Sequence, residues 1–198
     1  MSGASVTPLS SKSERSRLSA ADWQQAALDL IAEQGVLAVA VEPLAKRLNV
    51  TKGSFYWHFP SREALLKSAL ERWEAADQET LFDQIEAIND PRQRLQELFL
   101  RTSRELRSHI IYSQLLKAMD HAVVKPVIER LSVRRINYLL AAYRAIGLPR
   151  REALHRARLA YSVYAGILQL MLQQKIMRMD PEEYQAYVQH VADTLIPA

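Results

Sequence analysis

Residues 51–58 combine, in one short stretch, several side-chain types that proteins use to contact DNA. The stretch reads Thr-Lys-Gly-Ser-Phe-Tyr-Trp-His. Lys52 offers a positive charge to a phosphate, and the hydroxyls of Ser54 and Tyr56 can hydrogen-bond base edges or phosphate oxygens. Gly53 has no side chain, so a helix that carries it can approach a groove wall closely. The residues predicted to contact DNA are Thr51, Lys52, Gly53, Ser54, Tyr56, Trp57, His58 and, just beyond the stretch, Arg62.

Three helices are predicted to hold this stretch in place. Ser19 is a candidate N-cap with Asp22 three residues later, as in a capping box. Apolar residues then recur at helical spacing until Gly35, which can take the left-handed conformation that ends a helix. A second helix is predicted over 41–48 and a third over 51–59, with a tight turn between them. A supporting helix followed by two short helices is the plan of a helix-turn-helix unit.

The aromatic residues of the third helix divide between two roles. An aromatic run is more often core than surface. Phe55 and Phe59 are four residues apart, so they share one helix face and are expected in the core. Tyr56 and Trp57 then point elsewhere, and His58 either faces the groove or packs inward.

From residue 26 to residue 66 the sequence resembles the N-terminal region of the TetR/AcrR-type transcriptional regulators. The first helix of that family is similar to AALDLIAEQG, its second helix and turn to VEPLAKRLNV, and its recognition helix with the start of the linker helix to TKGSFYWHFPSREALL. The resemblance implies that Lys52 and Tyr56 hold phosphates, while Thr51, Ser54 and Trp57 face the groove.

Two positions depart from the family pattern. Ala40 stands where the family usually has a threonine that caps the second helix and touches a phosphate. Asn49 replaces a usual glycine, and asparagine tolerates the left-handed conformation that the turn needs. The first departure puts one backbone contact in doubt, and the second is expected to be harmless.

The rest of the chain carries helix signals and no sustained strand pattern. Asp-Pro pairs at 90–91 and 180–181 read as helix starts, and Gly147 is expected to end a long helix that begins near Val123. The sequence therefore predicts an all-α fold of about nine helices, with an N-terminal three-helix helix-turn-helix domain and a C-terminal helical bundle. We expect a flexible basic arm over 1–18, a DNA-binding domain with its linker helix over 19–76, and a ligand-sensing and dimerisation domain over 77–198.

The C-terminal part offers less specific candidates. Seven-residue spacing along the predicted helix 149–176 indicates a dimer seam, a pocket wall or both. Because the family usually pairs its last two helices, 149–176 and 181–196 are the expected dimer interface. The predicted interface residues are Leu154, Tyr161, Leu168, Tyr184, Tyr187, Val188 and Val191. Candidates for lining a ligand pocket are Trp73, Phe99, Tyr112, Gln114, Met119, His121, Tyr138 and Tyr164, although residues at such helical spacing are more often plain core.

Composition limits the other classes of function. The 198 residues include no cysteine, carry a formal net charge of +4 and show no apolar run long enough for a membrane span. No catalytic set, metal-binding pattern or cofactor motif is recognisable, so no catalytic residue, metal or cofactor is expected. A cytoplasmic location, with no membrane association, is expected.

Together these patterns predict a homodimeric DNA-binding regulator, most simply a repressor released from double-stranded operator DNA by a small, mostly apolar effector. Two alternatives stay open. One is a helical enzyme or ligand carrier with a vestigial helix-turn-helix, and the other is a DNA-binding structural protein that senses no ligand.

Overall fold

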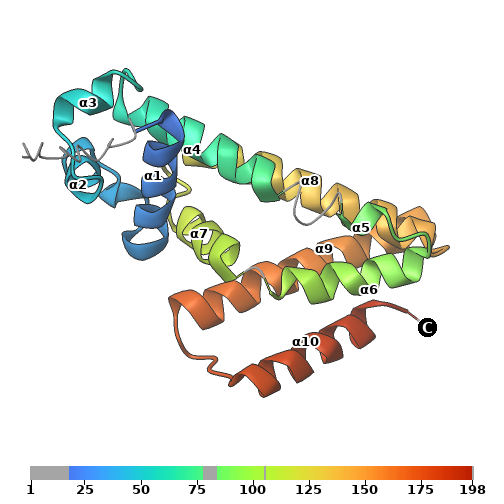
Figure 1. Ribbon diagram of the computed structural model, residues 1–198. Coiled ribbons are helices and arrows are strands. Elements are labelled where there is room, and N and C mark those ends of the chain that lie inside the picture. Colours follow the sequence, from blue (N-terminus) through green and yellow to red (C-terminus); the bar gives the residue numbers. More distant parts are fainter. Residues whose placement is uncertain (1–17, 78–83, 105, 198) are drawn as a thin grey trace, which may run out of the picture.

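The computed structural model describes residues 18–77, 84–104 and 106–197, and within them the predicted all-α fold is confirmed. These described residues form nine α-helices of five or more residues and no strand (Figure 1). Residues 1–17 of the predicted basic arm lie outside the described part of the chain. The elements are α1 (Ala20–Gln34), the 3-10 turn η1 (Val36–Ala38), α2 (Val41–Arg47), α3 (Lys52–Tyr56), α4 (Arg62–Asp77), the short α5 (Gln84–Glu86), α6 (Pro91–Thr102), α7 (Leu106–Lys117), α8 (Val124–Ala145), α9 (Arg150–Leu168), the π-helical turn η3 (Gln169–Gln173) and α10 (Pro181–Leu195).

Local signals account for both ends of α1. The Ser19 side chain accepts a hydrogen bond from the Asp22 amide, and the Asp22 carboxylate accepts from Ser19 in return, which completes the predicted capping box. Gly35 ends the helix with a φ of 87°, a value in the left-handed region that favours glycine. The segment after it, which has strand propensity, is the turn η1.

The turn between α2 and α3 has the predicted geometry at Asn49, whose φ is 55°. Two details differ from expectation. Thr51 occupies the N-cap position of α3, yet its side chain makes no capping hydrogen bond. The helix also ends at Tyr56 rather than near Phe59, and a turn follows in which the amides of His58 and Phe59 both donate to the Phe55 carbonyl.

One hydrophobic core crosses the predicted boundary between the domains. It joins buried residues of α1, α3 and α4 to buried residues of α7 and α8, among them Ile111, Leu115 and Ile128. A second cluster, centred on Tyr143 and Ala157, lies among α6, α8, α9 and the end of α10. The helix-turn-helix unit is therefore held against the C-terminal helices by shared packing as well as by the chain connection.

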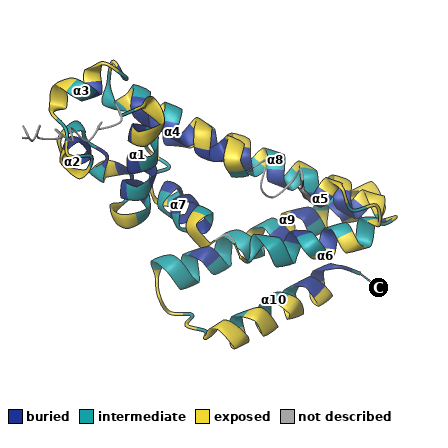
Figure 2. Cartoon of the chain, viewed as in Figure 1, coloured by how far each residue is buried: buried dark blue, intermediate teal, exposed yellow. Residues whose placement is uncertain are grey.

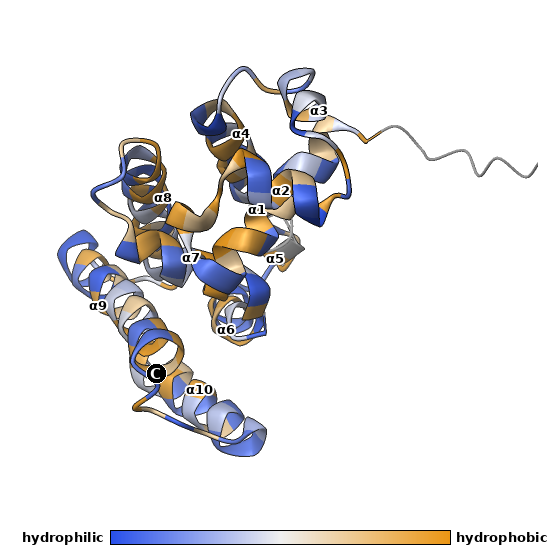
Figure 3. Ribbon diagram, turned by 90° about the vertical axis from the view of Figure 1, so that its left-hand side faces the viewer, coloured by the Kyte–Doolittle hydropathy of each residue, from blue (hydrophilic) through white to orange (hydrophobic). Residues whose placement is uncertain are grey.

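The C-terminal helices form a layered arrangement. Helices α8 and α9 pack along each other, and α6 lies against both α8 and α10 (Figure 1). Helix α10 is buried near its C-terminal end, at Ala192 and Leu195, and elsewhere it is half-buried or exposed (Figure 2). Viewed from the side, α9 and α10 lie together at one edge of the molecule, away from α3 (Figure 3). Among the described residues, no helix combines the length and the apolar composition that a membrane-spanning segment needs.

Candidate functional site

The third helix presents one face to the core and another to solvent. Phe55 is fully buried and packs edge-on against Trp23, with the ring centroids 5.4 Å apart. Phe59 lies next to it, also buried. Tyr56 and Trp57, which follow Phe55 in the sequence, point outward, since they are 63% and 89% exposed. The aromatic run therefore divides between core and surface in the way that the spacing indicated.

The outward face of α3 carries most of the residues that were predicted to contact DNA. Thr51, Lys52 and Gly53 are exposed, whereas Ser54 and His58 are half-buried. Lys52 Nζ lies 2.8 Å from a carboxylate oxygen of Glu42 on α2, and both side chains are largely exposed. The hydrogen bond from Lys52 lowers the pKa of the Glu42 carboxyl. An exposed ion pair of this kind contributes little free energy, so a phosphate can replace the carboxylate at low cost.

Replacing Lys52 by alanine is expected to flatten the salt dependence of DNA binding by about one unit of slope, as the loss of one phosphate contact would. The measurement is the dissociation constant as a function of salt concentration. Arg101→Ala serves as the control, because Arg101 is paired with Glu97 on the distant helix α6. An unchanged slope in the Lys52 variant would exclude a phosphate contact at that position.

Arg62 is placed differently from the remaining predicted contacts. Its guanidinium donates to the backbone carbonyl of Val39 and, at 3.2 Å, to that of Val36. A third nitrogen lies 3.5 Å from Nε2 of His121, in the turn before α8. Arg62 thus ties the start of α4 to η1 and to the C-terminal helices, and these bonds compete with the expected phosphate contact.

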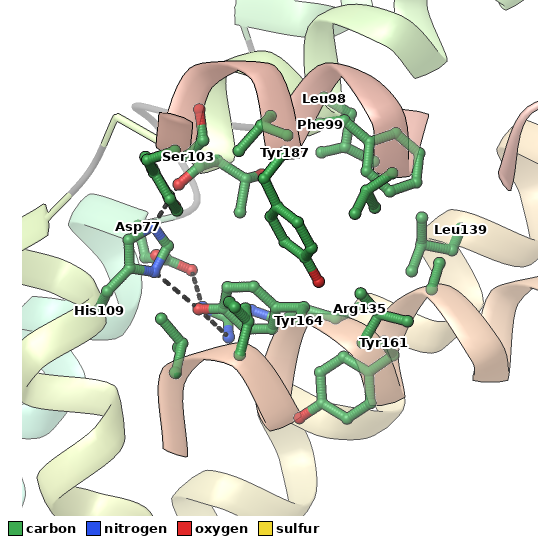
Figure 4. A pocket seen from close by; sticks show the side chains of 18 residues that line it. Asp77, Leu98, Phe99, Ser103, His109, Arg135, Leu139, Tyr161, Tyr164 and Tyr187 are labelled. Atoms are coloured by element: carbon green, nitrogen blue, oxygen red, sulfur yellow. Dashed lines mark hydrogen bonds and ion pairs between the residues drawn. The ribbon is translucent and has the colours of Figure 1, made fainter. Parts of the chain in front are cut away.

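A cavity of about 120 Å³ lies between α6, α8, α9 and α10 (Figure 4). Two of the predicted pocket residues, Phe99 and Tyr164, line it. Six of the seven residues predicted at the dimer interface also line it, with only Leu154 outside: they are Tyr161, Leu168, Tyr184, Tyr187, Val188 and Val191. Within one chain, these side chains therefore turn toward the cavity, which is one of the two roles that the seven-residue spacing allowed.

The other predicted pocket residues lie elsewhere. Trp73 and Tyr112 belong to the main core, where the Trp73 indole donates to Ser108. Met119 packs against the same core, and Tyr138 against the second cluster. Gln114 borders a separate, more polar depression beside η3, and His121 faces Arg62 as described above. All six residues lie outside the cavity: Met119 and His121 are in the turn between α7 and α8, and the other four are on helix faces that point elsewhere.

Polar groups converge at one end of the cavity. Arg135 donates to Asp77 at 2.9 Å and to the Tyr164 hydroxyl at 3.3 Å, and His109 lies 3.0 Å from the same hydroxyl (Figure 4). The opposite end is apolar, with Leu98 and Leu139 among its lining residues. Burial raises the pKa of Tyr164 to about 12, so its hydroxyl is neutral at physiological pH. A mostly apolar space with a few convergent polar groups is typical of small-molecule sites.

Asp77 and Arg135 were not among the residues predicted from the sequence. A signal for Arg135 does exist, because it lies midway between Leu131 and Leu139 on the buried stripe of α8. A charged residue within such a stripe indicates a buried ion pair or a polar site. A comparable signal marks Asp77, because it follows the buried residues Leu70 and Trp73 of α4 at helical spacing.

Comparison with known proteins agrees with this arrangement. Residues 25–69 match the family described as bacterial regulatory proteins, tetR family. The tetracycline repressor protein class A from transposon 1721 of Escherichia coli is 45% identical over 47 residues, which are 24% of this chain and 22% of that protein. The matches to curated relatives cover only 14–22% of the length of those proteins.

Solved structures resemble the chain over most of its length. A TetR transcriptional regulator from Legionella pneumophila is 17% identical, with a TM-score of 0.73 over 89% of this chain and 96% of the other. A protein from Saccharomonospora viridis, solved in complex with choline, is 21% identical, with a TM-score of 0.74 over 89% and 94% of the two chains. At these identities the likeness concerns the fold.

The helix-turn-helix segment of the chain matches the tetR family of bacterial regulatory proteins, so the resemblance in the sequence is confirmed. The fold of the remaining helices is that of solved regulators of this family. That family consists of transcriptional regulators and not of enzymes.

Proposed function

We propose that this protein is a homodimeric transcriptional regulator that binds operator DNA through α3 and is released by a small, mostly apolar ligand. The observation that carries the proposal is the division of α3 into two faces. Phe55 anchors the helix in the core, while Tyr56, Trp57 and Lys52 stand exposed beside the small residue Gly53. Because operator DNA is its proposed target, the protein is proposed to act in the cytoplasm.

Dimerisation is proposed to use α9 and α10. Over 181–190 helix α10 is exposed except at Tyr184, Tyr187 and Val188, which line the cavity and are half-buried, so that part of each side chain stays accessible to a second copy. Leu159, on α9, is a large apolar side chain that is 53% exposed. Apolar surface of this kind at the edge of a helical layer supports an interface with a second copy. Two copies would then present two α3 helices to successive major-groove faces of a roughly palindromic site.

The cavity is the proposed ligand site. Its apolar lining supports a mostly apolar ligand, and the choline complex of the S. viridis protein is an example of a small ligand bound to a protein of this fold. A ligand releases DNA only to the extent that it binds one conformation better than the other. We propose that the protein is a repressor and that ligand binding weakens its binding to operator DNA.

Selection of bound sequences from random double-stranded DNA tests this proposal. We expect enrichment of a roughly palindromic sequence, with half-site centres separated by about 34 Å or a multiple of that distance. Sedimentation of the complex should give two protein chains per duplex or a multiple of two. Enrichment of no sequence, or tight binding by a monomer, would contradict the proposal.

A further inference from the structure

The polar end of the cavity is also the place where α4 is attached to α8. Asp77, the last residue of α4, and Arg135, on α8, form an ion pair whose side chains are only 8% and 9% exposed. Both residues line the cavity. The other oxygen of the Asp77 carboxylate accepts a hydrogen bond from Ser108 of α7 at 3.1 Å.

A second carboxylate attaches α4 to α8 outside the cavity. Glu74 accepts hydrogen bonds from Arg130 at 2.6 Å and from Arg134 at 3.0 Å. Glu74 is not among the lining residues. A molecule in the cavity can therefore compete with Asp77 for its arginine, but not with Glu74.

Arg135 can exchange its carboxylate partner without losing its other contacts. Its guanidinium carbon lies 4.7 Å from the ring centroid of Tyr112 and 5.4 Å from that of Tyr164. Cation–π contacts with both rings stay in place if Asp77 moves away. An incoming carboxylate can also accept two parallel hydrogen bonds from one guanidinium.

We propose that the cavity takes a mostly apolar molecule that bears one carboxylate, and that this carboxylate replaces Asp77 on Arg135. The inference rests on the proposed function and names the ligand class and the switching contact for the same site. The tail of the ligand would occupy the apolar end near Leu98 and Leu139. A cationic ligand is disfavoured, because it would have to pair with Asp77 beside a buried guanidinium that keeps its positive charge.

This exchange of carboxylates on Arg135 explains how ligand binding in the cavity would change the position of α3. Two carboxylates that share one buried guanidinium repel each other, so Asp77 must turn away from the cavity. Because Asp77 lies in the last turn of α4 that the structure describes, its release detaches this part of the helix from α8. Glu74 keeps its pairs with Arg130 and Arg134, so α4 would pivot about this point and shift α3 at its other end.

Titration calorimetry of the full-length protein with octanoate, octanol and octylamine tests the ligand class. The three probes share an apolar tail and differ in the charge of the head group. We expect octanoate to bind at least about tenfold more tightly than octanol, and octylamine to bind more weakly than both. Absence of octanoate binding, or equal or tighter binding of either other probe, would overturn the proposal.

The variant Asp77→Asn separates binding from switching. It removes the competing charge and keeps the side-chain shape, so octanoate should bind about tenfold more tightly than to the unmodified protein. The same octanoate should release operator DNA from the unmodified protein but not from Asp77→Asn. Glu74→Gln is the matched control on the same helix, and its octanoate affinity should stay within about twofold of the unmodified value.

If Asp77→Asn binds octanoate no more tightly than the unmodified protein does, the proposed exchange of carboxylates on Arg135 is refuted. The ranking of the three probes on the unmodified protein tests the ligand class independently of the stability of any variant. Failure of the proposed function would look different, since a protein that ranks the probes as expected but enriches no DNA sequence has the carboxylate site and is not an operator-binding regulator.

Discussion

Replacing Gly53 by valine is expected to lower operator affinity roughly a hundredfold or more, toward the level of non-specific binding. The reason is a clash with DNA and not a clash within the protein. A Cβ atom built at Gly53 meets only Thr51 Oγ1, at 3.7 Å, which is an ordinary van der Waals contact. The protein therefore tolerates the larger side chain, and the free energy of unfolding should stay within about 1 kcal/mol. The expected loss arises where the helix presses against DNA.

Two measurements check this expectation, the operator dissociation constant and chemical denaturation of the free protein. Gly53→Ala provides a graded comparison, because the single methyl group of alanine should weaken operator binding less than the larger, branched side chain of valine. Full operator affinity in Gly53→Val would show that α3 does not approach DNA closely at this position.

Replacing Phe55 by alanine is expected to lower the free energy of unfolding by roughly 3–5 kcal/mol, the usual range for a buried aromatic residue. Phe55 is fully buried and contacts Trp23, Tyr56 and Phe59, so its loss leaves a cavity at the centre of the helix-turn-helix core. Because this side chain fixes α3 against α1, operator binding should fall together with stability.

Trp57→Ala is the matched control for this variant. Trp57 is only two residues away and is 89% exposed, so its removal should change the free energy of unfolding by less than about 0.5 kcal/mol. Denaturation curves of the two variants give the comparison. A Phe55→Ala protein as stable as the unmodified one, or a strongly destabilised Trp57→Ala protein, would mean that the two faces of α3 are assigned the wrong way round.

The helix-turn-helix unit could be predicted from the sequence because local chemistry determines it. Ser19, Gly35 and Asn49 act through backbone geometry and neighbouring residues, and each adopts the conformation that its type favours. The spacing of Phe55 and Phe59 was enough to separate core from surface. The end of α3 was predicted too late, because the turn at Trp57 and His58 keeps hydrogen bonds to the Phe55 carbonyl and has no sequence signal of its own.

The cavity could not be predicted in the same way, because its residues meet only through packing between distant segments. Asp77, Arg135 and Tyr164 belong to three helices, and their contact depends on how α4, α8 and α9 cross. Seven-residue spacing along α9 correctly indicated an apolar face, but the same pattern serves a partner chain or a pocket. Arg62 illustrates a related limit, since its carbonyl partners, Val36 on η1 and Val39 just after it, are set by the fold and not by the position of Arg62 near the start of a helix.

The absence of cysteine from the chain allows a direct test of the claim that α3 lies in the groove. A single cysteine introduced as Trp57→Cys can carry an iron chelate that cleaves nearby DNA. We expect cleavage of the selected operator at two positions, one in each half-site, and no cleavage from the same chelate at Gln185→Cys on the exposed face of α10. Cleavage from α10 with none from α3 would contradict the account.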